Sequence, residues 1–194
     1  MPSDALLAWQ NDRLPRLVNV EADCLHLQAL HAAAPARAQE FIRSYAVLLS
    51  SEFQGFCRKL HDECADKLIA SVAPVSLQDM LRLQCVYGRK LETGNPNVGN
   101  LGADFNRFNF DFWTAVLAIA PSHTVRRHRL AMLNAWRNAI AHHDYDPVQL
   151  GGTTILTLVQ VRDWRIDCDA FAVTFDTVLR NYLQATTSML PWPP

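Results

Sequence analysis

The sequence predicts an all-α fold in which a single domain forms a helical bundle. Alanine and leucine together number 49 residues, valine and isoleucine number 20 and glycine numbers 7, a balance that favours helices over sheets. Apolar residues also recur at steps of three and four along two long segments, one in the first half of the chain and one at its end. A chain of 194 residues has the length of one domain and can bury a sizeable core, so we expect one domain spanning residues 1–194.

One long helix dominates the structure expected for the first half of the chain. Before it, residues 1–35 mix leucines with Pro15 and an alanine cluster, which predicts a short helix or two with an irregular connection. The long helix is expected over residues 35–74, because apolar residues lie there on one helical face: Ile42, Tyr45, Leu49, Phe53, Phe56, Leu60, Cys64 and Leu68.

A shorter helix and a loop are expected next. Ser76 with Asp79 three residues later is typical of a capping box, which predicts a helix from there to about Leu91. Residues 93–103 hold three glycines, one proline and three asparagines, so we expect a loop.

The second half of the chain predicts three further helical segments and a short tail. Helical spacing restarts over residues 105–119, and Ser122 is a candidate N-cap for a helix that runs through Ala141. Residues 188–194 form a proline-rich tail that cannot continue a helix. The long last helix before it carries a buried stripe of Val161, Trp164, Cys168, Phe171, Phe175, Val178 and Tyr182.

Charge balance and cysteine usage limit the classes of function. A net charge of −1 gives no global positive field, so any contact with nucleic acid must be local. The five cysteines are odd in number and include no CxxC pair, which indicates reduced thiols. The longest apolar run, Ala115 to Ala120, is six residues long, whereas roughly 18 are needed to span a bilayer. The amino terminus shows no export signal of basic residues followed by an apolar stretch. We therefore expect a cytoplasmic protein without a membrane partner.

Arg137, Asn138 and His142 form the candidate catalytic group, at the end of the helix expected to reach Ala141. At about 100° per residue, Asn138 and His142 share a helical face and Arg137 lies one step round it. These residue types suit RNA cleavage by the RNA's own 2′-hydroxyl, because that reaction needs proton transfer and charge stabilisation but no protein nucleophile, metal or cofactor. We expect His142 to move protons and Arg137 to bind the phosphate. Asn138 is expected to orient either His142 or Arg137.

The segment RNAIAHH, residues 137–143, resembles the motif of the HEPN family. In that motif an arginine and a polar residue, often asparagine, precede a histidine four to six positions after the arginine. The chain is also similar to the RiboL-PSP-HEPN subgroup in its long early helix, its GNLG segment at residues 99–102 and its long last helix. The resemblance implies a metal-independent endoribonuclease of a toxin or antiviral defence system. It also implies a homodimer in which two motifs face one another.

His143 leaves a second interpretation of the motif open. It is either the family's histidine, at a longer spacing from Arg137, or a second proton carrier beside His142. At the longer spacing, the ending His143-Asp144-Tyr145 is similar to that of HEPN toxins paired with a nucleotidyltransferase antitoxin. That likeness implies Tyr145 as a site of modification with AMP, and an antitoxin or regulatory protein as a partner. A homodimer also follows from the chemistry, because cleavage benefits from an acid and a base while one chain has a single motif.

A basic run precedes the motif on the same helix. Arg126, Arg127 and Arg129 are candidate RNA-binding residues that would follow the phosphates of a strand, or else they form a solvated face paired with acids. The alternative to the ribonuclease is a catalytically silent HEPN-like module that dimerises and binds RNA or a protein. Replacement of His142 distinguishes the two functions, because it should abolish RNA cleavage by the ribonuclease but leave binding by the silent module largely intact.

Cys57, His61 and Cys64 share a helical face and therefore merit comparison with metal sites. Zinc needs a fourth ligand, and no CxxC or HxxxH pattern nearby supplies one. We expect these residues to be part of the core and expect no metal site.

Overall fold

The computed structural model describes residues 1–31, 33–72 and 74–192, and the regular elements in these ranges are all helical. The predicted all-α bundle is confirmed. Within the described ranges, no helix combines the length and apolar character needed to cross a membrane. The elements are α1 (Asp4–Ala8), a π-helical turn (Trp9–Arg13), α2 (Leu14–Leu30), α3 (Pro35–Ala70), α4 (Val75–Val86), α5 (Lys90–Thr93), α6 (Val98–Phe105), a 3-10 turn (Asn106–Phe108), α7 (Phe112–Ile119), α8 (His123–His142) and α9 (Leu158–Thr187).

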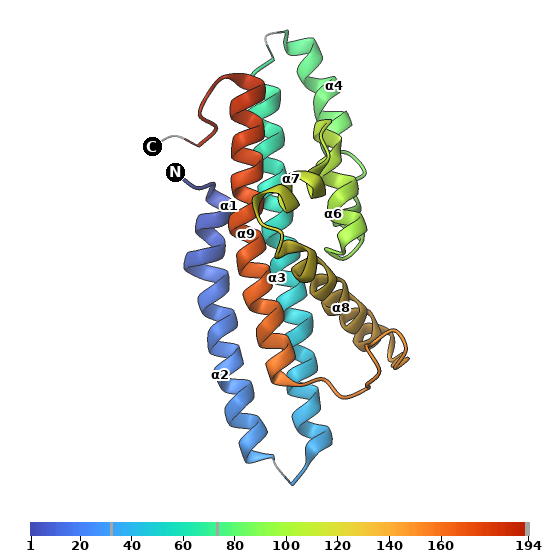
Figure 1. Cartoon of the computed structure of the whole chain (residues 1–194). Helices are drawn as coiled ribbons and strands as arrows, with labels where there is room; N and C mark the ends of the chain where they lie inside the picture. Colours follow the sequence, from blue (N-terminus) through green and yellow to red (C-terminus); the bar gives the residue numbers. More distant parts are fainter. Residues whose placement is uncertain (32, 73, 193–194) are drawn as a thin grey trace.

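The long helix α3 is the axis of the bundle. Helices α2 and α9 run alongside it, and α8 lies obliquely on the side away from α2, as Figure 1 shows. Helix α8 contacts both α3 and α9, whereas α4 contacts α3 near one end of the bundle. The helix that carries the candidate motif is therefore held against the two longest helices of the molecule.

Aromatic packing joins the smaller helices to this frame. Phe105 of α6 stacks on Phe112 of α7 with 4.4 Å between ring centroids, and Phe112 meets Phe175 of α9 nearly edge-on at 4.8 Å. Phe175 also lies 6.0 Å from Phe53 of α3. All four rings are fully buried, so they contribute apolar burial and aromatic contacts to one shared core.

The predicted helices within residues 1–35 are present, but the break that Pro15 indicates is absent. The chain is helical from Asp4 to Leu30, with a π-helical turn just before Pro15. Proline has no N–H to donate to the carbonyl four residues back, and the wider turn accommodates it. In this turn the Leu14 N–H donates to the carbonyl of Trp9, five residues earlier, and the helix continues.

The capping box predicted at Ser76 is also wrong. Helix α4 begins one residue earlier, after Pro74, and no side chain caps it. It ends at Val86 rather than near Leu91, because the backbone of Tyr87 is extended, and Gly88 follows with a left-handed φ of 69°.

The loop predicted over residues 93–103 is correct only in its first part, because α6 begins at Val98. Its N-cap is Asn97, whose side-chain oxygen accepts the N–H of Asn100 at 2.8 Å. Gly102, one of the glycines that predicted a loop, instead lies in α6 and allows close packing. A Cβ on Gly102 would lie 3.0 Å from the Trp113 ring, whose Nε1 donates to the Val98 carbonyl at 2.9 Å. A glycine on a helix thus permits close approach of a large side chain.

The two long helices of the second half are confirmed. Helix α8 runs one residue beyond the predicted end, and α9 carries the expected buried stripe. A capping box of Thr157 and Gln160, which the sequence reasoning missed, opens α9. In the predicted tail, Ser188 ends α9 with a left-handed backbone and Trp192 is buried, while residues 193–194 lie outside the described residues.

A buried carboxylate connects three helices of the frame. Glu21 of α2 accepts hydrogen bonds from the Tyr45 hydroxyl of α3 at 3.2 Å and from Arg165 Nε of α9 at 2.9 Å. Arg162, also on α9, forms a second ion pair with the same carboxylate. Burial alone would raise the pKa of Glu21, but the hydrogen bonds and charges of the two arginines hold it below its usual value. Glu21 is therefore a charged crosslink between α2 and α9.

We expect Glu21→Gln to destabilise the fold by about 2–3 kcal/mol, because it leaves two guanidinium groups without their counter-charge. Urea unfolding at neutral pH measures this loss. Glu40→Gln is the matched control, since the Glu40 side chain is 67% exposed and, among the described residues, pairs with Arg43 of its own helix alone. The control should change stability by less than about 0.5 kcal/mol, and equal effects of the two substitutions would contradict the crosslink.

Candidate functional site

The candidate site lies at the C-terminal end of α8. The helix stops because His143 adopts a left-handed backbone with φ of 53°, and the N–H groups of His143 and Asp144 both donate to the Ala139 carbonyl. Both histidines of the motif, His142 and His143, are exposed. The chain turns away here, which opens the last turn of α8 to solvent.

The structure brings Asn138 and His142 together, as their spacing predicts. Both line a hollow of about 170 Å³, with apolar walls from Ala135, Ala139 and Leu150. Arg137 lies beside it, and its Nη1 donates to Asn138 Oδ1 at 3.4 Å. Among the described residues, no hydrogen bond joins Arg137 directly to His142. Asn138 is therefore the residue that connects the arginine with the hollow.

Asn95, which the sequence reasoning missed, fixes the orientation of Asn138. Its Nδ2 donates to Asn138 Oδ1 at 2.7 Å, so this oxygen receives donors from both Asn95 and Arg137. A guanidinium only donates hydrogen bonds, and this assigns the oxygen of the Asn138 amide to the Arg137 side. The Asn138 NH₂ group is consequently left for another acceptor.

The segment that carries Asn95 is itself held from several directions. Asn100 Nδ2 donates to the Asn95 carbonyl at 2.8 Å, and Gln54 Nε2 donates to the Gly94 carbonyl at 2.8 Å. Asn134, one turn before Asn138 on α8, donates to the Pro96 carbonyl at 3.2 Å. No spacing rule predicts the contacts of Gln54 and Asn134, because each joins residues about 40 positions apart.

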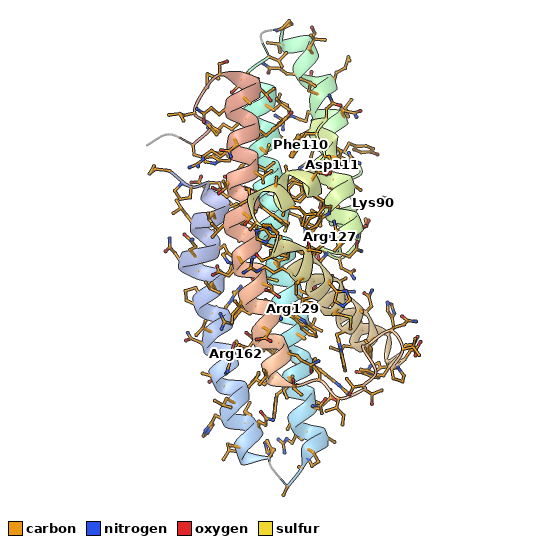
Figure 2. The ribbon with its side chains drawn as sticks, in the orientation of Figure 1. Lys90, Phe110, Asp111, Arg127, Arg129 and Arg162 are labelled. Atoms are coloured by element: carbon orange, nitrogen blue, oxygen red, sulfur yellow. The ribbon has the colours of Figure 1, made fainter. Side chains whose placement is uncertain are left out.

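Two residues of the candidate RNA-binding run share one acid. Arg126 Nε lies 3.3 Å from Asp167 Oδ1, and Arg129 Nη1 lies 3.4 Å from Asp167 Oδ2. Burial raises the pKa of Asp167, although the two arginines oppose this shift. Arg127 lies over the Trp113 ring at 5.7 Å, and Figure 2 shows Arg127 and Arg129 on the face of the molecule that it depicts. The run is thus a partly paired surface with a net positive charge.

Tyr145 attaches the segment after α8 to the frame. The Arg43 guanidinium of α3 lies 4.3 Å above its ring, and the Trp136 ring of α8 lies 6.5 Å away. The tyrosine is half-buried. These contacts hold the chain just beyond the two histidines, as a cation over an aromatic face is favourable.

Cys57, His61 and Cys64 are core residues, as expected. All three are fully buried, and His61 Nδ1 accepts from Arg89 Nη1 at 3.0 Å, which leaves its Nε2 to donate to the Asp104 carbonyl at 3.1 Å. The part of the chain that the structure describes holds no group of three or more residues able to bind a metal ion. Burial and the nearby Arg89 charge lower the pKa of His61 to about 3.

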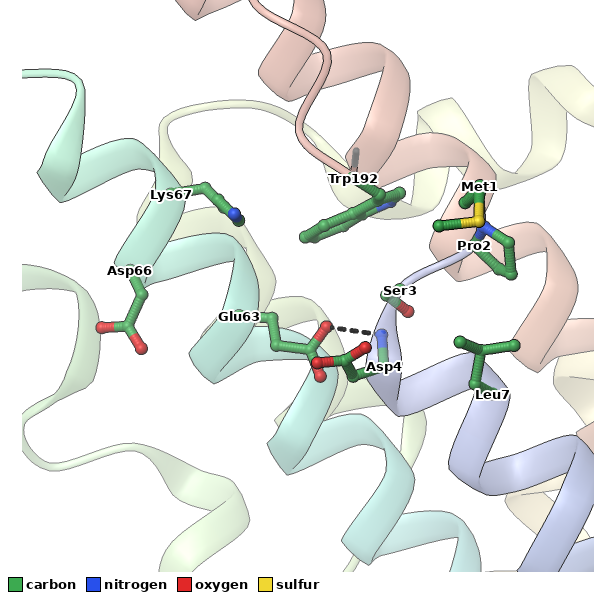
Figure 3. Close-up of a pocket in the computed structure, with 9 residues that line it drawn as sticks. All are labelled: Met1, Pro2, Ser3, Asp4, Leu7, Glu63, Asp66, Lys67 and Trp192. Carbon is green, nitrogen blue, oxygen red and sulfur yellow. Dashed lines mark hydrogen bonds between the residues drawn. The ribbon is translucent and has the colours of Figure 1, made fainter. Parts of the chain in front are cut away.

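A second hollow lies away from α8, where α1 meets α3 and the C-terminal segment (Figure 3). Its volume is about 320 Å³, and Glu63 Oε2 accepts the Asp4 N–H there at 3.0 Å. Burial and the Asp4 carboxylate raise the pKa of Glu63 to about 7. Two of its lining residues carry a buried polar atom that has no hydrogen-bond partner among the described residues, Glu63 Oε1 and Trp192 Nε1. None of the predicted site residues lines it.

Compared with known proteins, the chain matches no family model, no curated protein and no solved structure. The interpretation of the site therefore depends on its own residues and geometry. Within that geometry, hydrogen bonds join Arg137, Asn138 and Asn95, and Asn138 lines the same hollow as His142.

We expect His61 to make the fold sensitive to acid. The folded chain keeps His61 neutral down to about pH 3, whereas the unfolded chain binds a proton below the ordinary value of 6.5. Stability contributed by the neutral ring is present above pH 6.5 and falls by about 1.4 kcal/mol per pH unit below it. In urea unfolding, the difference in free energy of unfolding between the unsubstituted protein and His61→Gln should be smaller at pH 5 than at pH 7. A difference independent of pH would contradict this assignment.

Proposed function

We propose that the chain is a metal-independent endoribonuclease of HEPN type, belonging to a toxin or antiviral defence system. The observation that supports it most is the arrangement at the end of α8. There Asn138 bonds Arg137 through its oxygen and lines the same hollow as His142. A phosphate-binding cation, an oriented amide and an imidazole thus lie within about one and a half helical turns.

In the proposed reaction the 2′-oxygen of the RNA attacks the adjacent phosphorus, and the bond from phosphorus to the 5′-oxygen breaks. One base takes the proton of the 2′-hydroxyl, and one acid gives a proton to the departing 5′-oxygen, so that a 2′,3′-cyclic phosphate and a 5′-hydroxyl result. Arg137 stabilises the added negative charge on the phosphate oxygens, and the free NH₂ of Asn138 donates to one of them. His142 is the proposed proton carrier.

A homodimer supplies the second proton carrier in this scheme. His142 lines the hollow and His143 does not, so the two histidines of one chain face different surroundings. A twofold axis would place a second His142 opposite the first and give the reaction both an acid and a base. His143 is the alternative second carrier, and Tyr145 is a candidate site for modification by an antitoxin.

We propose that Arg126, Arg127 and Arg129 contact the RNA backbone. A guanidinium carries five N–H donors, so Arg126 and Arg129 retain donors for phosphate while they pair with Asp167. The second candidate function is a silent module that binds RNA or a protein without cutting, and these arginines would serve it equally well. The presence or absence of RNA cleavage decides between the ribonuclease and the silent module.

The decisive experiment is the incubation of purified protein with total RNA in EDTA, beside His142→Ala, His143→Ala and Arg137→Ala. We expect cleavage with 2′,3′-cyclic phosphate ends, lost by at least about 100-fold in Arg137→Ala and in one histidine variant. The other histidine variant serves as the matched control, because both side chains are exposed at the same helix end. Absence of cleavage by folded, dimeric protein would favour the silent module.

Asn95→Ala should lower kcat by about 10- to 100-fold and leave KM nearly unchanged, because Asn138 and through it Arg137 lose their fixed orientation. Asn138→Ala should lose at least as much, because it also removes the NH₂ donor to the phosphate, and the double variant should be little worse than Asn138→Ala alone. Asn97→Ala is the control for a general loss of structure in the segment that carries Asn95. Asn97 caps α6 but, among the described residues, forms no hydrogen bond with the motif. Equal losses in kcat for Asn95→Ala and Asn97→Ala would exclude a positioning role.

A further inference from the structure

The hollow beside Asn138 and His142 has its own chemistry, which the cleavage reaction does not use. Its far wall comes from the segment after α8, through Asp144, Gln149 and Leu150. The carboxylate of Asp144 and the amide of Gln149 form no hydrogen bond or ion pair with any other described residue. Two exposed polar groups thus stand at the rim of a hollow with a small apolar lining.

This wall is held in place by its own backbone. The Asp144 N–H donates to the Ala139 carbonyl at 3.0 Å, and the Leu150 N–H donates to the carbonyls of Asp146 and Pro147 at 3.2 Å each. Asp146 Oδ1 also accepts the Val148 N–H at 2.9 Å, and Leu150 itself is buried. The polar groups at the rim are therefore mounted on a structured turn, as a preformed binding site requires.

Size and charge limit what the hollow accepts. At about 170 Å³ it is smaller than the roughly 300–1,000 Å³ of sites for drug-sized molecules, so one ring system fits rather than a whole nucleotide. The Asp144 carboxylate repels a phosphate, whereas Arg137 attracts one beside the hollow. A nucleotide would therefore direct its phosphate to Arg137 and its base into the hollow.

We propose that this hollow is a subsite for guanine in the RNA next to the cleaved phosphate, an inference that rests on the proposed ribonuclease function. An ionised carboxylate only accepts hydrogen bonds, and the Watson–Crick edge of guanine presents two adjacent donors, N1–H and N2–H₂. Gln149 then donates to the O6 of the base. Of the apolar lining, the partly exposed Ala135 packs against the ring, whereas Ala139 and Leu150 are buried beneath it.

The test measures binding without cleavage. The guanosine, adenosine, cytidine and uridine 3′-monophosphates are titrated into the ¹⁵N-labelled protein at low salt and followed by NMR. The guanosine nucleotide should bind at least about tenfold more tightly than the other three and shift the side-chain amide signals of Asn138 and Gln149. Asp144→Asn should remove this preference, and Asp23→Asn, at an exposed position on α2, is the matched control.

The outcomes separate this inference from the proposed function. Guanine-selective binding that depends on Asp144 supports the subsite even if the protein cuts no RNA. Equal binding of the four nucleotides, or no binding of any of them, overturns the subsite even if RNA is cut. In a protein that cleaves, cuts next to guanine that lose their preference in Asp144→Asn add support, and cuts without base preference overturn it.

Discussion

Burial of the apolar stripe of α3 is the constraint on which the rest of the molecule depends. This helix runs from Pro35 to Ala70 and contacts α1, α2, α8 and α9, so each of them is positioned by the same helix. The Glu21 carboxylate then connects α2 to α9 across the bundle. Helix α8 packs against both α3 and α9, and the contacts of Asn95 with Asn138 and of Arg43 with Tyr145 hold the chain at its C-terminal end.

Much of this frame could be predicted from the sequence because helical periodicity is a local signal. The long stripes of α3 and α9 repeat for many turns, and no single residue decides them. The predictions failed where one residue had to be interpreted without its neighbours in space. Pro15 indicated a break but is accommodated by a π-helical turn, and Gly102 indicated a loop but lies in a helix that makes room for Trp113.

The candidate site divides in the same way. The helical repeat alone places Asn138 and His142 on one face, and the structure confirms it. Asn95 and Asp167 could not be predicted, because each acts on α8 from a distant part of the chain. Asp144 follows the motif directly, yet only the turn of the chain at His143 brings it to the hollow. Local periodicity therefore predicts which residues share a face, and tertiary contacts determine what surrounds them.

The contacts around Asn138 explain how so small a group of residues could be chemically useful. An exposed arginine loses conformational entropy when it orders around a phosphate, and that cost reduces its benefit in the transition state. Here the Asn138 oxygen is already bonded to both Asn95 and Arg137, and Asn95 is held by a segment docked on α8. Part of the ordering cost is consequently met during folding. The stability of the bundle and the geometry of the site thus depend on the same packing of α8.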